Sequence, residues 1–153
     1  MIHPANDAEK KLAQAPHNLF ISSVFMFDLL MTPAAIAINI GMYGLLLPLT
    51  LSLSVVAYIY KRSRASTHSA YAAAHWQLAF RRCLWLMAGY AVSATLIFLA
   101  WLVSLTTQAS MQHILWTALT RIAILPTLLA VMVTLVMEAG AMSQASKGEG
   151  IGK

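Results

Sequence analysis

Long apolar runs alternate with short polar segments along the chain. Residues 19–60 carry a single charge, Asp28, yet this stretch is about twice as long as the roughly 20 residues that one helix needs to cross a bilayer. The stretch must therefore fold back once. A polar, glycine-rich turn around Asn39 is the natural place for the reversal, because such residues interrupt helices. The pattern predicts two membrane spans, at residues 19–38 and 43–60.

Two further apolar runs follow a basic segment at residues 61–82. They predict a third span at residues 83–105 and a fourth at residues 114–137, each long enough to cross the hydrocarbon core. The ends of the chain are polar. We expect a polar N-terminal tail at residues 1–18, a membrane domain at residues 19–138, and a flexible, Gly/Ser/Lys-rich C-terminal tail at residues 139–153.

The basic residues predict the orientation of these spans. Lys10 and Lys11 precede the first span, five Lys or Arg residues lie between the second and third spans, and Lys147 and Lys153 follow the fourth. The two remaining loops have no Lys or Arg. Because positive residues collect on the cytoplasmic side, both termini are predicted to be cytoplasmic, with the protein in the inner membrane of a bacterium.

The composition agrees with a membrane protein and excludes other classes. Hydrophobic residues make up 59% of the 153 residues and charged residues only 10%, whereas about a quarter of a soluble domain is charged. The net charge of +5 is concentrated beside apolar spans, which is typical of membrane topology rather than of nucleic-acid binding. The expected partner is the lipid bilayer, and no nucleic-acid partner is predicted.

Polar residues inside the predicted spans are the first candidate site. Placing Asp28 or Arg121 at mid-membrane costs about 2.5–3.5 kcal/mol, so each calls for an explanation. Asp28 shares a helical face with Thr32 and Asn39, and Glu138 closes the fourth span. These residues are intramembrane coupling candidates for a proton- or ion-coupled transporter. The alternative is that Asp28 only forms a hydrogen bond between helices, and an Asp28 to Arg121 ion pair is a further open question.

A second candidate site lies where the third span meets the inner interface. No Pro interrupts residues 68–105, so one helix is expected to run from the cytoplasm into the membrane. His75, Trp76, Arg81 and Arg82 would then gather at lipid-headgroup depth as a headgroup or quinone site. The alternative is ordinary anchoring, because Trp and Arg collect at membrane interfaces without a specific ligand.

Small residues in the third span predict close helix packing. Gly89, Ser93 and Ala100 recur on related turns, which lets a neighbouring helix approach closely. Such a stripe serves packing within the bundle, self-association or docking of another membrane subunit.

Cofactors and catalysis receive little support from the residues. The chain has no HExxH, Walker, CxxC or GxSxG motif, so no catalytic residue, metal site or cofactor is predicted. Haem b is an alternative because it needs two axial histidines at one depth, and His17 and His75 are the one conceivable pair.

The sequence therefore predicts an all-α integral membrane protein, a four-transmembrane-helix bundle made of two helical hairpins. The function predicted first is a non-catalytic accessory or assembly subunit of a larger membrane complex. The alternative is a small oligomeric proton- or ion-coupled transporter with Asp28 as the coupling carboxyl. A haem b or quinone-binding protein comes third.

Overall fold

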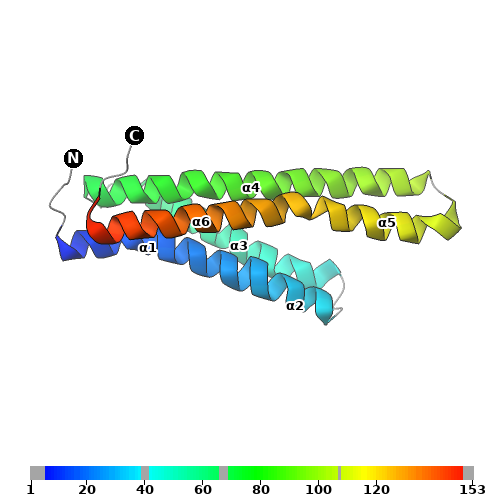
Figure 1. The fold of residues 1–153 in the computed structure, drawn as a ribbon, viewed down its shortest axis with the longest axis horizontal. Helices are drawn as coiled ribbons and strands as arrows, with labels where there is room; N and C mark the ends of the chain where they lie inside the picture. Colours follow the sequence, from blue (N-terminus) through cyan, green and yellow to red (C-terminus); the bar gives the residue numbers. More distant parts are fainter. Residues whose placement is uncertain (1–5, 39–41, 66–68, 107, 150–153) are drawn as a thin grey trace. The chain divides into compact units, whose positions relative to one another are not determined.

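Helices make up nearly all of the structure, a computed structural model that describes residues 6–38, 42–65, 69–106 and 108–149. In chain order, the helical segments within these residues are α1 (Asp7–Ser23), the π-helix η1 (Val24–Met31), α2 (Thr32–Ala37), α3 (Met42–Ser63), α4 (Ala70–Leu105), α5 (Ala109–Ala123) and α6 (Leu125–Lys147) (Figure 1). The described residues contain no strand. The prediction of an all-α protein is confirmed at this level.

The chain divides into two units. Unit 1 comprises Met1–Cys83 with Leu135–Lys153, and unit 2 comprises Leu84–Thr134. Unit 1 therefore holds α1, η1, α2, α3, the first part of α4 and the last part of α6. Unit 2 holds the rest of α4 and α6 together with α5.

The polar N-terminal segment is helical from Asp7 onward. Asn6 caps α1 by accepting hydrogen bonds from the backbone N–H groups of Ala8 and Glu9, while the Glu9 carboxylate accepts from the Asn6 N–H. This reciprocal capping box fixes the start of the helix. The expected tail at residues 1–18 is thus, from residue 7, part of the same helix that continues into the predicted first span.

The helix changes its hydrogen-bonding pattern before Pro33. From Val24 to Met31 it is a π-helix, and at its end both the backbone N–H and the hydroxyl of Thr32 donate to the carbonyl of Phe27. A proline ring clashes with the carbonyl four residues earlier and has no N–H to donate. The wider π turn relieves this conflict, and it places Asp28 in an irregular stretch of the kind found at functional sites.

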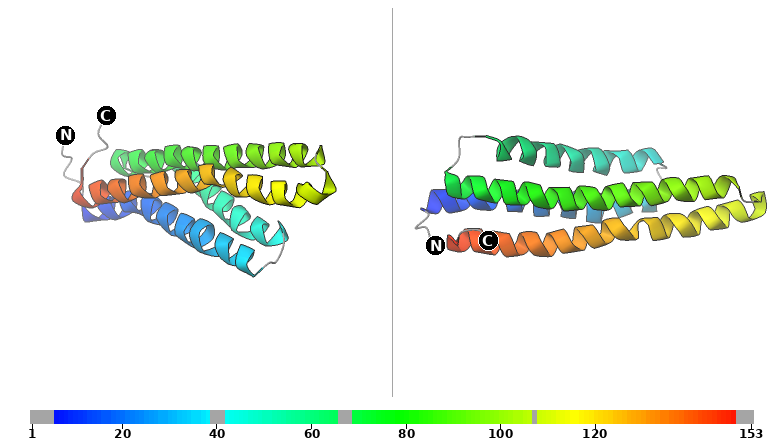
Figure 2. Two further views of the ribbon diagram at one scale, coloured as in Figure 1. Left: turned by 45° about the vertical axis from the view of Figure 1, so that its right-hand side comes forward. Right: turned by 90° about the horizontal axis from the view of Figure 1, so that it is seen from above.

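Helix α4 is one unbroken element of 36 residues, shown in green in Figure 2. At 1.5 Å per residue it is about 54 Å long, which exceeds the roughly 30 Å hydrocarbon core. The expected continuation of the third span into an N-terminal extension is confirmed from Ala70 onward.

In unit 2, α4 packs closely against α6. A Cβ atom at Gly89 would lie 2.5 Å from Cβ of Ala130 and 3.3 Å from the carbonyl oxygen of Pro126. One turn along, the hydroxyl of Thr127 donates to Oγ of Ser93 at 2.9 Å. The predicted small-residue stripe thus forms a helix contact at Gly89 and Ser93, and Ala100 is also buried, with 5% of its surface exposed.

The predicted fourth span, at residues 114–137, is divided between α5 and α6. The break falls at Ile124, directly before Leu125 and Pro126, because proline fits the first turn of a new helix better than a helix interior. Helix α6 then continues to Lys147. The segment expected as a flexible tail, residues 139–153, is therefore helical for more than half of its length.

Three helices are long and apolar enough to cross a membrane, among the residues that the structure describes. They cover Asp7–Ala35, Ala70–Leu105 and Met111–Lys147. These helices indicate an integral membrane protein. Helix α3 is not one of the three.

Candidate functional site

Three buried polar side chains from three helices meet in unit 1. His17 comes from α1, His75 from α4 and Glu138 from α6, and each has 0% of its surface exposed. We call these residues the His–Glu cluster. Burial of three polar groups with no access to water is costly unless they bond to one another.

The cluster is a continuous chain of contacts. Nδ1 of His17 lies 2.5 Å from Oε2 of Glu138, and Nε2 of His17 lies 3.0 Å from Nδ1 of His75. The two imidazole rings meet edge to face, with centroids 5.2 Å apart. His17 is therefore the central member, using both ring nitrogens at once.

Arg82 supplies a positive charge to the carboxylate. Its Nη1 lies 3.4 Å from Oε1 of Glu138 and donates a hydrogen bond of 2.5 Å to the carbonyl of Met137. The Arg82 side chain is 12% exposed. A buried carboxylate is expensive unless it is paired and hydrogen-bonded, and Arg82 and His17 together provide that pairing.

Tyr71 covers the other side of His75. Its ring centroid lies 4.9 Å from that of His75, and its hydroxyl lies 3.2 Å from the carbonyl oxygen of Ala145 and 3.3 Å from that of Glu149. The backbone of Glu149 reaches this position because Gly148, with φ of 76°, ends α6. Within the described part of the chain, Nε2 of His75 is buried and forms no hydrogen bond of standard geometry.

The end of α6 is a Schellman motif. The Gly148 N–H donates to the carbonyl of Ala145, and the Glu149 N–H donates to that of Gln144. Gly is favoured at this position because a side chain would be strained at positive φ. The motif turns the chain back toward Tyr71, so the C-terminal end of α6 closes over the His–Glu cluster.

Periodic small and polar residues bring the cluster together. In α1 the buried positions are Ala13, Pro16, His17, Phe20 and Ser23, which recur at helical spacing on one face. In α6 the buried positions are Val131, Thr134, Glu138, Ala141 and Ala145. In α4 they include Ala72, His75, Trp76, Ala79 and Cys83. The alanines let the backbones approach closely enough for the short Glu138 side chain to reach its partners.

The cluster can hold a proton in more than one place. An ionised Glu138 requires an N–H at Nδ1 of His17, and Nε2 of His17 then either accepts from His75 or, when His17 is protonated, donates to it. These arrangements differ by one proton and by a tautomer change of His75. Relays of this kind, built from buried carboxylates and imidazoles, are typical of proton-handling membrane proteins.

Three residues predicted separately from the sequence lie in or next to the His–Glu cluster, namely Glu138 and His75 within it and Arg82 beside it. Glu138 was expected as an intramembrane coupling group, and His75 and Arg82 were expected at a headgroup or quinone site. His75 and Glu138 are both linked to His17, and the partly exposed Arg82 contacts Glu138. His17 was considered only as a haem ligand, and its contact with Glu138 could not be foreseen from spacing.

The remaining intramembrane candidates lie elsewhere. Asp28 and Thr32 are half-buried in or next to η1, and Asn39 lies outside the described residues. Arg121 is exposed in the last turn of α5 and belongs to unit 2, so its pairing with Asp28 stays a prediction.

The other interface candidates are split between burial and exposure. Trp76 is 4% exposed and packs beneath Arg62, whose guanidinium carbon lies 5.6 Å from the indole centroid. Arg81 is exposed. The four predicted residues on α4 therefore differ in burial, and their common role as a headgroup or quinone site stays a prediction.

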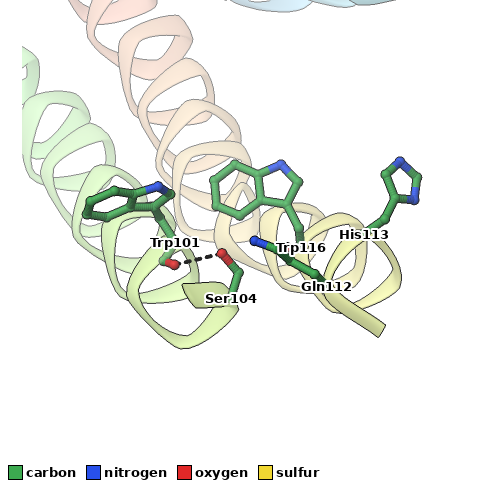
Figure 3. A pocket seen from close by; sticks show the side chains of 5 residues that line it. All are labelled: Trp101, Ser104, Gln112, His113 and Trp116. Atoms are coloured by element: carbon green, nitrogen blue, oxygen red, sulfur yellow. Dashed lines mark hydrogen bonds between the residues drawn. The ribbon is translucent and has the colours of Figure 1, made fainter. Parts of the chain in front are cut away.

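Unit 2 contains a pocket of about 390 Å³ between α4 and α5. It is lined by Trp101, Ser104, Gln112, His113 and Trp116, and Figure 3 shows the His113 ring directed away from the other side chains. Ser104 donates to the carbonyl of Trp101. Exposed Trp side chains at a helix end are typical of a membrane interface.

Binding of a metal ion or of haem iron requires several ligand atoms arranged around one point. Within the described residues, no group of three or more His, Cys, Asp or Glu side chains is arranged to hold a metal ion. The facing nitrogens of His17 and His75 are 3.0 Å apart, whereas two axial nitrogens on opposite sides of a haem iron, each about 2 Å from it, would be about 4 Å apart. The pair anticipated for haem b is close in space, and the two side chains are spaced for a hydrogen bond.

Comparison of the chain with protein-family models, curated proteins and solved structures finds no match. The His–Glu cluster is therefore the feature of the structure that bears most directly on function.

Proposed function

We propose that this protein is a small proton-coupled membrane transporter whose proton-binding centre is the His–Glu cluster. The observation that supports the proposal is the contact of the buried Glu138 carboxylate with His17, and of His17 with His75. Ionisable groups buried in a membrane protein are costly and commonly mark proton relays. The coupling carboxyl is then Glu138 rather than Asp28.

The proposal includes a four-span arrangement with both termini cytoplasmic. Helix α3 has 22 residues and a length of about 33 Å, enough to cross a core of about 30 Å. Lys61 and Arg62 lie in its last turn, as expected for a helix that ends at the cytoplasmic face of a bacterial inner membrane. The His–Glu cluster then lies toward the cytoplasmic side.

A transporter of this size would work as an oligomer. Four helices seldom enclose a pathway alone, and the described surface is rich in exposed Leu, Val, Phe and Trp residues. Such residues serve contact with lipid or with another copy of the chain.

Proton flux in liposomes tests the proposal. The purified protein is reconstituted into liposomes that contain a pH-sensitive dye, a membrane potential is imposed, and proton entry is recorded with a panel of small organic cations and anions. We expect substrate-dependent flux with the wild type and its loss in Glu138→Gln, which cannot bind and release a proton. Asp28→Asn is the matched control and should retain the flux.

Two results would contradict the proposal. One is a Glu138→Gln variant that has the same unfolding temperature as the wild type and also the same proton flux. The other is loss of flux in Asp28→Asn alone, which would return the coupling role to Asp28.

One observation favours a second candidate, the accessory or assembly subunit. Arg121 is an exposed cation within the apolar helix Met111–Lys147, and an arginine in lipid is costly without a partner or a route to the interface. A carboxylate from another membrane subunit would offset that cost. Extraction in mild detergent should then recover the wild-type protein in a defined complex, and Arg121→Ala should not form this complex. A wild-type protein that purifies alone would exclude this candidate.

A further inference from the structure

Two arginines at the C-terminal end of α3, in unit 1, are stacked on aromatic rings. Arg62 lies over the Trp76 indole at 5.6 Å, and Arg64 lies over the Tyr60 ring at 5.4 Å, measured from the guanidinium carbon to the ring centroid. Tyr60 in turn packs on Phe80 of α4, with centroids 5.0 Å apart. Cations over aromatic faces are attracted by the ring quadrupole, so both guanidinium groups are held in defined positions.

Arg62 is the arginine whose environment calls for an anion. Its side chain is half-buried, and its Nε is buried without a hydrogen-bond partner among the described residues. Stacking uses the face of the guanidinium and leaves the N–H groups on its edge available for bidentate contacts. An anionic oxygen acceptor would stabilise a partly desolvated cation that has an unused N–H group.

Few acidic residues of the chain could serve as the acceptor for Arg62. Its five acidic residues are Asp7, Glu9, Asp28, Glu138 and Glu149, and none lies in α3 or α4. The ion pairs given by the described residues join Asp7 to Lys10 and Glu138 to His17 and Arg82. None of these ion pairs, within the described residues, involves Lys61, Arg62 or Arg64 at the end of α3.

The neighbouring tyrosines indicate the surroundings of these basic residues. Tyr58 and Tyr60 are 49% and 44% exposed, and Tyr58 packs edge-on against Trp76 at a centroid distance of 6.2 Å. Tyrosine and tryptophan collect at headgroup depth because they present an apolar body and a polar tip. The site therefore faces the region where lipid phosphates lie.

We propose that the C-terminal end of α3, where it packs on the aromatic rings of α4, binds the phosphate of an anionic phospholipid, with the edge of the Arg62 guanidinium as its main ligand and Arg64 as a second cation. This site is distinct from the His–Glu cluster and does not depend on the transport function. It differs from the headgroup site expected on α4 alone, since His75 is hydrogen-bonded to His17 and Arg82 to Glu138. Trp76 remains in it as the platform beneath Arg62.

Thermal unfolding in lipid nanodiscs tests the proposal. The full-length protein is placed in dioleoyl phosphatidylcholine discs, and the melting temperature is recorded as dioleoyl phosphatidylglycerol replaces a growing share of the lipid. We expect the wild type to melt several degrees higher with the anionic lipid. Arg62→Ala and Arg62→Lys should each lose more than half of this shift, because lysine keeps the charge but loses the planar, bidentate edge.

A matched control separates a site from general surface charge. Lys147 is an exposed basic residue in the last turn of α6, as Arg62 is a basic residue in the last turn of α3. Lys147→Ala should keep the full shift. If Lys147→Ala and Arg62→Ala lose equal shares, or if Arg62→Lys keeps all of the shift, binding is general electrostatic attraction and the proposal is wrong.

Two further experiments identify the ligand. Inorganic phosphate or glycerol phosphate added to phosphatidylcholine discs should give no shift, since the acyl chains must anchor the headgroup beside the tyrosines. A shift as large as that with phosphatidylglycerol would assign the site to a soluble phosphate instead. Native mass spectrometry should show phosphatidylglycerol retained by the wild type and not by Arg62→Ala, which gives an answer even if the variant is less stable.

Discussion

Nδ1 of His17 lies 2.5 Å from Oε2 of Glu138, although the two residues are 121 positions apart in the sequence. This contact ties α1 to α6, and the contact of His17 with His75 adds α4. One hydrogen-bonded chain therefore holds three helices of unit 1 in register. It is also the part of the molecule on which the proposed function depends.

Removing the carboxylate should destabilise unit 1. In Glu138→Ala, Arg82 loses its carboxylate partner and the ring nitrogen of His17 loses its contact with Oε2, and breaking a buried pair in this way costs about 3–5 kcal/mol. Glu138→Gln keeps one acceptor oxygen and should cost less. The measurement is the free energy of unfolding in a denaturing-detergent titration.

Asp7→Asn is the control for that titration. Asp7 is 97% exposed and pairs with Lys10 one turn away, so its loss should change stability by less than about 1 kcal/mol. Equal effects of Glu138→Ala and Asp7→Asn would mean that the His–Glu cluster does not hold the helices together.

Gly89→Ala should loosen the hairpin of unit 2. The new methyl group would lie 2.5 Å from Cβ of Ala130, so the helices must separate at a cost of about 1–3 kcal/mol. Gly140→Ala is the matched control. Nothing lies within 4 Å of a Cβ at Gly140, and replacing a helical glycine by alanine should stabilise by about 0.5–1 kcal/mol.

The same titration with a double variant checks the cause. Ala130→Gly should restore much of the stability that Gly89→Ala loses, because it removes the clashing methyl group. A Gly89→Ala variant as stable as Gly140→Ala would show that α4 and α6 are not in close contact at this position.

Gly148→Ala should loosen the C-terminal closure over the cluster. At φ of 76° a side chain costs about 1–2 kcal/mol, so the Schellman motif should open and the contact of Tyr71 with Glu149 should weaken. Hydrogen exchange is expected to speed up at the amides of Gly148 and Glu149. Gly140→Ala is the control and should leave exchange at the Gly148 and Glu149 amides unchanged. If Gly148→Ala also leaves exchange at these amides unchanged, the C-terminal end of α6 does not close over the His–Glu cluster.

The purified protein should show no Soret absorption. The facing nitrogens of His17 and His75 are spaced for a hydrogen bond, not for an iron atom between them. An absorption spectrum of protein extracted from membranes checks this directly. A Soret band that disappears in His17→Ala would mean that the pair separates to ligate haem b, and it would overturn the proton-binding role of the cluster.

Local features of the fold could be read from the sequence, whereas the cluster could not. The absence of proline in residues 68–105 predicts an unbroken helix, which the structure describes from Ala70 to Leu105, and Gly89 with Ser93 predicts a close helix contact. Both depend on neighbours in sequence. The contact of His17 with Glu138 depends on how distant segments pack, for which one sequence holds no direct signal.

Two signals in the polar ends were nevertheless present. Asn6 and Glu9 stand at capping-box spacing, and the small residues Ala141 and Ala145 continue the buried face of α6 beyond Glu138. Low hydropathy led both ends to be assigned as tails. In both ends, small residues pack around the His17–Glu138 contact, and this packing stabilises the helices although the sequence has no long apolar run at these positions.

The central claim is that His17, His75 and Glu138 share protons as one unit. Its most direct test is a pH titration of the ring nitrogens by ¹⁵N NMR, with the exposed His113 as internal reference. We predict that the His17 and His75 signals change over the same pH range, as those of coupled groups do, and that the His113 signal changes over a different range. Glu138→Gln should shift the midpoint of the joint His17 and His75 transition. Independent titration of His17 and His75, each matching His113 and unaffected by Glu138→Gln, would contradict the account.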